Sequence, residues 1–332
     1  MRRAGIQHIF GLALLLVTGA MAPAQAVSVA EPQQAAAEQP ASTSKDALAE
    51  LVRKVRAAPD QFSYADLSLA VAGEIYPGLA GEKAAAFRKD VDALAAKVRD
   101  SLKPEQPAQE KVARANAAIY QHGGMKCAES TPPEQERPDF YFPHATWERK
   151  KGVCLGLTAL YLCVAEKAGL PMYAMHAPQH IFVRYDDTKE QVNVETTDGG
   201  RVFEVSAYLT RFKAEDRERL KEVYFKRLDK VEVLGDLLNA AAWCSAIETA
   251  PKPLPPERAL LAARLCVEIG PQDYNNWDTL AQACAYAGNP KQALEAIRKA
   301  VAMRPPAVGS YDERYWESRL KRFSEAEAKA RK

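Results

Sequence analysis

Apolar residues recur at helical spacing in the region that precedes two glycines, Gly123 and Gly124. The first predicted helix has an apolar face of four residues: Leu48, Leu51, Val52 and Val55. Ser63 and Asp66 have the spacing of a capping box, which predicts the start of a second helix that runs to about Tyr76. Two more helices are expected from further apolar faces: Phe87, Val91, Leu94 and Val98, then Val112, Ala115 and Ile119.

The helical pattern breaks after the two glycines. Residues 125–149 contain several prolines and are expected to be irregular, although their aromatic residues should keep them packed. A further helix is predicted to begin at Cys154 and to end at Gly169. Glycine suits the left-handed position after a helix, and Pro171 prevents continuation.

Short β segments come next, and they are expected at 172–176, 180–185 and 191–196. Polar residues 186–189 separate the last two segments, which predicts a β-hairpin. After Arg201 the pattern is again helical, through about Lys226.

An internal repeat occupies the C-terminal part of the chain from about Asn239. Five pairs of identical residues lie 34 positions apart: Trp243 and Trp277, Pro256 and Pro290, Ala259 and Ala293, Leu260 and Leu294, Pro271 and Pro305. This period is typical of tetratricopeptide repeats, each a helix-turn-helix. Two copies are fewer than a free-standing array needs, so we expect them to dock on the preceding domain. An amphipathic helix from about Tyr311 to Ala330 is a plausible cap.

The start of the chain has the features of a secretory signal peptide. Arg2 and Arg3 precede a short apolar core, and a small-residue cleavage site ends at Ala26. The polar residues 27–43 predict a flexible leader. No other stretch is long and apolar enough to span a membrane. We therefore expect an exported protein, periplasmic or secreted, with no membrane span after cleavage.

Composition excludes some classes of function. The 332 residues include 45 basic and 43 acidic ones, and 47% of the chain is hydrophobic, which is ordinary for globular domains. Removal of the signal peptide would take away Arg2 and Arg3 and balance the charges. Nucleic-acid-binding proteins normally carry a basic excess, so no nucleic-acid partner is expected.

One of the six cysteines has a distinctive setting. Cys154 begins a predicted helix, where free N–H groups and the helix dipole favour a thiolate, and Lys150 and Lys151 could add positive potential. Gly152 allows a tight turn into that helix. Cys163 falls on the opposite helix face and is expected in the core. An exported protein meets an oxidising compartment, so disulfides stay open for the cysteines besides Cys154: Cys127, Cys163, Cys244, Cys266 and Cys284.

A thiolate nucleophile requires an acid–base group and a third group that orients it. His180 begins a predicted strand and is the candidate base. If the hairpin loop is even and centred between Asp187 and Thr188, His180 lies directly opposite Glu195. That carboxylate would then fix the tautomer and orientation of the imidazole. An odd loop would break the pairing.

A metal site is an alternative use of the same residues. Its candidate ligands would be Cys127, His144, Cys154, His176 and His180. Their spacing matches no standard zinc pattern, so neither a metal nor another cofactor is expected.

Three segments carry these residues: RKKGVCLGLTALYLCVAEKAGLP at 149–171, APQHIFVRY at 177–185 and VNVETTDGGR at 192–201. Together they resemble the transglutaminase-like superfamily of papain-type thiol enzymes, most closely its bacterial SirB-like branch. The helices before the site and a tetratricopeptide tail after it also look like that branch. The resemblance covers roughly residues 60–305.

The resemblance implies a Cys-His-acid triad. Cys154 falls on the nucleophile, His180 on the base and acid, and Glu195 on the orienting carboxylate, where the superfamily more often has Asp. The implied fold class is α+β: helices, then a papain-like core in which a helix packs on a small antiparallel sheet, then an all-α repeat tail. The expected domains are a signal peptide (1–26), a leader (27–43), a transglutaminase-like domain with N-terminal helices (44–230), two repeats (231–307) and a capping helix (308–332).

Two functions follow from these expectations. The first is a cysteine enzyme that hydrolyses an amide or transfers an acyl group on a peptide or protein substrate. The second is an inactive scaffold whose repeats bind a protein or peptide partner, because many members of the branch lack the cysteine. The sequence leaves the substrate, the choice between hydrolysis and transamidation, and the oligomeric state open.

Overall fold

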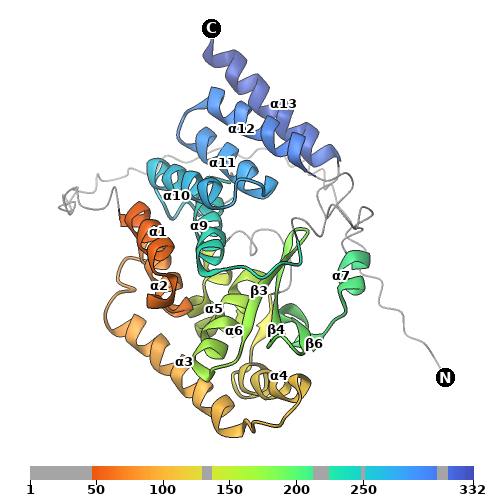
Figure 1. Ribbon diagram of the computed structural model, residues 1–332. Helices are drawn as coiled ribbons and strands as arrows, with labels where there is room; N and C mark the ends of the chain where they lie inside the picture. Colours follow the sequence, from red (N-terminus) through yellow and green to blue (C-terminus); the bar gives the residue numbers. More distant parts are fainter. Residues whose placement is uncertain (1–46, 129–136, 212–223, 248–250, 305–312) are drawn as a thin grey trace, which may run out of the picture. The chain divides into compact units, whose positions relative to one another are not determined.

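The structure is a computed structural model (Figure 1), and it describes residues 47–128, 137–211, 224–247, 251–304 and 313–332. All of these residues belong to one unit, Thr43–Lys332. The expected signal peptide and leader lie outside the described residues. None of the helices within the described ranges is long and apolar enough to cross a membrane.

The N-terminal helices follow the apolar pattern. They are α1 (Ala47–Ala57), α2 (Tyr64–Ile75), α3 (Glu82–Ser101) and α4 (Ala108–Asn116). The expected capping box is present, because the Ser63 side chain accepts from the backbone of Asp66 and the Asp66 side chain accepts from the backbone of Ser63. A π-helical turn, η2 (Ala117–His122), continues α4 before Gly123.

The segment expected to be irregular is partly helical. It contains β1 (Lys126–Cys127), the 3₁₀ turn η4 (Pro138–Phe140) and α5 (Pro143–Arg149), while 129–136 lie outside the described residues. Both η4 and α5 begin with a proline. Proline tolerates the first helical position because the N–H that it lacks would have no partner there. Prolines taken as helix breakers therefore mark helix starts in this segment.

Helix α6 (Cys154–Ala168) begins and ends where the sequence predicts. Gly169 caps it in the left-handed conformation, with φ at 76°. Apart from Cys154, Glu166 and Lys167, its residues are buried, so neighbouring elements enclose the helix. Its first turn touches the segment before it, because Gly156 lies against the Phe140 carbonyl and the Thr146 side chain.

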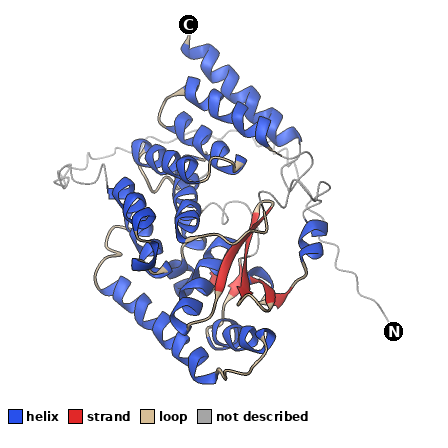
Figure 2. Ribbon diagram, viewed as in Figure 1, coloured by secondary structure: helices blue, strands red, loops and turns tan. Residues whose placement is uncertain are grey.

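A four-stranded antiparallel sheet lies beside α6 (Figure 2). Its strands, in spatial order, are β3 (Met172–Ala177), β4 (His180–Asp186), β5 (Gln191–Glu195) and β6 (Arg201–Val202). A separate parallel pair joins β1 to β2 (Lys151–Gly152), directly before α6. The mixed helical and sheet class is confirmed, with a small antiparallel sheet and a helical C-terminal region.

The hairpin is present, but its expected register is wrong. Asp186 pairs with Gln191 and Val183 pairs with Val194, so the loop centre lies between Thr188 and Lys189. By this register Glu195 lies nearest to Phe182 rather than opposite His180. The shift moves the pairing by two residues, and side chains alternate with a period of two, so the face of each residue is preserved.

The C-terminal region departs from the sequence pattern at two places. Its helices are α7 (Val205–Arg211), α9 (Lys230–Ala246), α10 (Pro256–Ile269), α11 (Tyr274–Tyr286), α12 (Pro290–Met303) and α13 (Glu313–Ala330). The helix expected to reach Lys226 does not extend that far. Residues 224–226 are not helical, and Arg227, which follows them, forms a β-bridge with Met175. Residues 212–223, which would complete that helix, lie outside the described part.

The repeat period is visible in some helices and not in others. Pro256 and Pro290, one period apart, begin α10 and α12. Trp243 lies near the end of α9, however, whereas Trp277 lies near the start of α11. The two copies of the repeat therefore place their equivalent tryptophans at different points of a helix. Assignment of these helices to the tetratricopeptide family stays a prediction.

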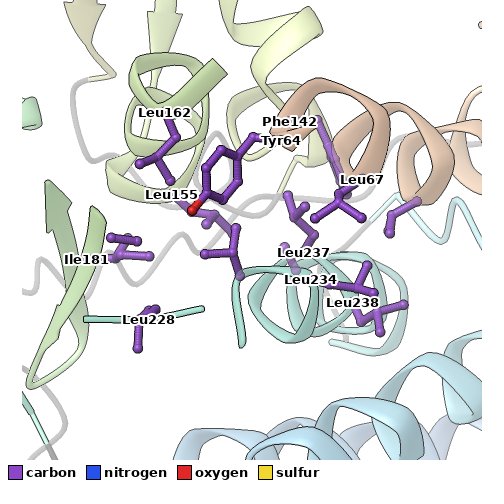
Figure 3. Packing of buried hydrophobic residues seen from close by; sticks show 14 of the residues in the cluster. Tyr64, Leu67, Phe142, Leu155, Leu162, Ile181, Leu228, Leu234, Leu237 and Leu238 are labelled. Carbon is purple, nitrogen blue, oxygen red and sulfur yellow. The ribbon is translucent and has the colours of Figure 1, made fainter. Parts of the chain in front are cut away.

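One hydrophobic core joins the N-terminal helices, the sheet and the C-terminal helices. It runs from Leu48 in α1 to Phe323 in α13. Figure 3 shows its centre, where residues of α2, α6, β4 and α9 meet, among them Leu67, Leu155 and Leu237. Leu155 directly follows Cys154, so the start of α6 is anchored in this core.

We expect Gly156→Ala to lower stability by about 1–3 kcal/mol, because the new methyl group would overlap the Phe140 carbonyl and Thr146. Gly73→Ala in α2 is the matched control, since a methyl group there meets nothing within 4 Å. That control should be neutral or stabilise by about 0.5–1 kcal/mol. Urea denaturation of both variants measures the difference, and equal midpoints would contradict the close packing at Gly156.

Candidate active site

The three predicted site residues all lie at the ends of their elements. Cys154 is the first residue of α6, His180 the first of β4 and Glu195 the last of β5. The Nε2 atom of His180 lies 2.8 Å from an oxygen of Glu195. The side chains of His180 and Glu195 are 7% and 0% exposed, so this pair is shielded from water.

Glu195 is held by further hydrogen bonds. The backbone N–H of Thr197 donates to its carboxylate at 2.9 Å, and the Thr197 hydroxyl donates to the same oxygen. Burial raises the pKa of Glu195, but the hydrogen bonds from His180 and Thr197 outweigh burial, and the pKa lies below its usual value. Glu195 is therefore a fixed carboxylate that orients the imidazole.

Cys154 completes the contact on the other side of the imidazole. Burial alone would raise the pKa of Cys154, but hydrogen bonds from His180 and from the backbone of Ile181 bring it below the ordinary thiol value. For His180, burial lowers the pKa, while Cys154 and Glu195 raise it to about 9. Because Nε2 faces Glu195, Nδ1 remains for the thiol. The arrangement therefore favours both the charged imidazolium of His180 and the thiolate of Cys154.

A single buried hydroxyl connects the three segments that carry these residues. Thr158 lies one turn after Cys154, and its hydroxyl donates to the carbonyl oxygen of Ile181, next to His180, at 3.3 Å. The hydroxyl oxygen of Thr158 also lies 3.1 Å from the hydroxyl oxygen of Thr196, which is next to Glu195. Thr158 is fully buried, so it ties α6 to both strands of the hairpin.

The expected contribution of the lysines is not supported. The ammonium of Lys150 lies 3.0 Å from the ring centre of Trp147, where burial lowers its pKa. Lys151 is exposed. Neither lysine is among the main causes of the lowered Cys154 pKa. Hydrogen bonds from His180 and Ile181, rather than nearby lysines, favour the thiolate.

The candidate metal ligands do not all lie around Cys154. His144 is buried apart from it, against Tyr76 and Phe142. Within the described ranges, no group of three His, Cys, Asp or Glu residues could hold a metal ion. None of the six cysteines forms a disulfide, and Cys163 lies in the core, where burial raises the pKa of its thiol.

A second histidine–carboxylate pair was not predicted. His176, on β3, places Nε2 2.9 and 3.0 Å from the two oxygens of Asp236 on α9. Burial lowers the pKa of His176, but the nearby carboxylates, Asp236 above all, raise it to about 9. The sequence singles out His176 only as a metal ligand. No local signal connects it with Asp236, because tertiary packing alone brings the two together.

A cavity of about 240 Å³ lies beside the thiol and the imidazole. One wall comes from the sheet and the start of α6. The opposite wall comes from α9 and α11 and includes Asp236, Asn239, Trp243, Asp273, Asp278 and Thr279. The Tyr315 hydroxyl of α13 donates to Asp278 at 2.5 Å and so braces this wall. The sequence predicted the thiol side of the cavity and missed the helical side.

Iodoacetamide should alkylate Cys154 at about pH 6 at least tenfold faster than the other five cysteines, because its thiolate fraction is raised. His180→Ala removes the hydrogen bond that lowers the pKa of the thiol and should slow this labelling. Peptide mapping by mass spectrometry gives the rate at each cysteine. A native-state rate at Cys154 no higher than that at Cys163 would contradict the thiolate–imidazolium pair.

The His176–Asp236 pair should make stability depend on alkaline pH. The pKa of His176 is about 9 in the folded chain and near 6.5 for a free histidine. Its contribution is therefore complete below about pH 6.5 and is lost as the pH rises through 9, by at most about 3 kcal/mol. Urea denaturation between about pH 6 and 10 should show this loss.

Asp236→Asn should flatten that dependence. Asp92→Asn is the matched control, because the Asp92 ion pair with Lys167 is exposed and should contribute little at any pH. If the two variants show the same pH dependence as the unaltered chain, the His176–Asp236 pair does not have this role.

Comparison with known proteins concerns the fold that carries this site. Residues 85–239 match the family model of the transglutaminase-like superfamily. No curated protein sequence matches the chain. Among solved structures, the crystal structure of menin, which reveals its binding site for the Mixed Lineage Leukemia (MLL) protein, has a TM-score of 0.54 at 14% identity. The similarity covers 85% of this chain and 68% of the menin chain, and it shows a shared fold. Residues 85–239 therefore form a domain of the transglutaminase-like superfamily.

Proposed function

We propose that this protein is an exported cysteine-dependent enzyme that cleaves or transfers the acyl group of an amide in a peptide or protein. The single observation that carries the proposal is the contact of His180 with Cys154 on one side and with Glu195 on the other. Export, to the periplasm or the medium, rests on the signal-peptide pattern in the sequence.

In the proposed reaction the Cys154 thiolate attacks the amide carbonyl carbon and forms a tetrahedral intermediate. The imidazolium of His180 gives its proton to the leaving amine, which departs and leaves a thioester on Cys154. Neutral His180 then takes a proton from water or from an amine, whose oxygen or nitrogen attacks the thioester carbon. The C–S bond breaks and the Cys154 thiolate leaves, which gives hydrolysis with water and transamidation with an amine. Glu195 holds the imidazole and stabilises its charged form in both steps.

The start of α6 offers donors for the oxyanion. The first N–H groups of a helix have no partner within the helix, and no side chain caps this helix at Val153. The N–H of Cys154 itself belongs to this set. These donors lie beside the attacking sulfur, where negative charge develops on the carbonyl oxygen.

A second candidate function is a scaffold that binds a protein or peptide partner without catalysis. It is favoured by the cavity wall that α9 and α11 contribute, and by the shared fold with menin, whose crystal structure is described with a binding site for the MLL protein. Under this proposal, Trp243 and its neighbours would contact the partner, and Cys154 would be dispensable.

The enzyme proposal is tested with a panel of peptides that carry backbone and glutamine amides. Release of ammonia or of peptide fragments reports hydrolysis, and uptake of a fluorescent primary amine reports transfer. Cys154→Ala should abolish the rate, and Glu195→Gln should lower it by about 10²- to 10⁴-fold. Asp198→Asn is the matched control, because Asp198 follows in the same loop but is exposed, and it should retain the full rate.

The scaffold proposal gives the opposite pattern in the cell that makes the protein. There, Cys154→Ala would preserve the phenotype of the intact gene, whereas Trp243→Ala would remove it. Loss of the phenotype with Cys154→Ala alone, in a variant that folds normally, would exclude the scaffold.

A further inference from the structure

We propose that Cys127 and Cys154 form a reversible disulfide when the protein meets a low-molecular-weight disulfide, and that this modification masks the proposed nucleophile. The inference rests on the proposed function only in that Cys154 must be a reactive thiol. It assigns a role to a second cysteine that the proposed reaction does not use.

The backbone places Cys127 next to the start of α6. Strand β1 pairs in parallel with β2, and Cys127 lies opposite Gly152. Its neighbours secure this register, since the N–H of Lys126 donates to Lys150 at 3.1 Å and that of Ala128 donates to Gly152 at 2.8 Å. Adjacent strands lie about 4.8 Å apart. Cys154 follows Gly152 by two residues, so the two cysteines lie within a short reach of each other.

The two cysteines also share an electrostatic environment. Burial raises the pKa of the Cys127 thiol to about 11, and the charge of Cys154 is the next largest cause. Glu195 affects both thiols. Such coupling means that the two thiols lie within range of electrostatic interaction, which agrees with the register.

Solvent exposure distinguishes Cys127 and Cys154 from the remaining cysteines. Cys127 and Cys154 are partly exposed, whereas the other four are at most 2% exposed and lie inside the core: Cys163, Cys244, Cys266 and Cys284. An external disulfide can therefore reach Cys154, and the one other partly exposed thiol is its neighbour in space.

The chemistry proceeds by two exchanges. The Cys154 thiolate attacks one sulfur of the small disulfide, forms a mixed disulfide and expels one thiolate. This step removes the negative charge of Cys154, which had raised the pKa of Cys127. Cys127 then loses its proton to solvent, attacks the sulfur of Cys154 and expels the second thiolate. Two protein thiols are oxidised, and one small disulfide is reduced to two thiols.

The backbone can accommodate this bond. A disulfide needs Cα atoms about 4.4–6.8 Å apart. Strands β1 and β2 have two residues each, and Lys150 before β2 has a positive φ of 58°. A small displacement of so short a parallel pair need not disturb the pairing of the four-stranded sheet, because β1 and β2 do not belong to it, although β1 also contacts the turn at Thr196–Asp198 that follows Glu195.

The test uses the full reduced chain with glutathione disulfide at about pH 8, where the low-pKa thiol is ionised. Intact mass and peptide mapping should show a Cys127–Cys154 crosslink with no retained glutathione. Reaction of Cys154 with iodoacetamide should fall at least tenfold and return after dithiothreitol. Cys127→Ser should instead retain one glutathione on Cys154, and an unchanged circular dichroism spectrum should show that this variant is folded.

The outcomes separate this inference from the proposed function. If Cys154 of the unaltered chain keeps its glutathione while Cys127 stays a free thiol, the disulfide is excluded and the reactive thiol is retained. If Cys154 takes up no glutathione even in Cys127→Ser, the thiol is unreactive, and both the inference and the proposed enzyme fail. A crosslink of Cys154 to any other cysteine also overturns the assignment.

Discussion

The buried hydroxyl of Thr158 fixes the relation between the helix that carries the thiol and the two strands that carry its partners. It is hydrogen-bonded to the residue after His180 and to the residue after Glu195. A buried hydroxyl must find partners, since leaving it unpaired would cost about 1–3 kcal/mol. The hydrogen bonds of Thr158, together with the apolar packing of α6, hold the helix against the hairpin. Cys154 lies one turn before Thr158 on the same helix and reaches His180.

Two cysteines of α6 show how position alone separates a thiol whose pKa is lowered from one whose pKa is raised. Burial raises the pKa of both. Cys163 has the core around it and keeps its proton. Cys154 has an imidazole and a backbone N–H within hydrogen-bond reach, and these outweigh the cost of burying a charge. The difference comes from what the first turn of the helix faces, because both residues belong to one continuous helix.

The sequence predicts the local features of this site well. A helix starting at Cys154 and a hairpin between His180 and Glu195 follow from apolar periodicity and turn residues, which act over a few positions. The hairpin register is shifted by two residues from the expected one. His180 and Glu195 still meet, because residues two positions apart share a face of a strand. Pro138 and Pro143 begin helical turns in a segment expected to be irregular, because proline both breaks helices and begins them.

The features that escaped prediction depend on long-range packing. Asp236 meets His176 only because α9 packs beside the sheet, and nothing in either local sequence specifies that encounter. The docking of α9 has a similar origin. This helix packs against α1 and α2 as well as against α10, and its Leu234 and Leu237 lie in the core beside Leu67.

The main hydrophobic core joins distant parts of the chain, and this has a consequence for its synthesis. Helix α2 shares its apolar contacts with α9, so residues near the N-terminus stay without their partners until α9 has been made. Contacts between such distant segments slow folding, because a long loop must close before the contacts stabilise it. A chain released before α9 would expose the apolar faces of α1 and α2 that pack against it. Helix α9 is thus an intramolecular partner needed to complete folding of the N-terminal helices, in addition to forming a wall of the cavity.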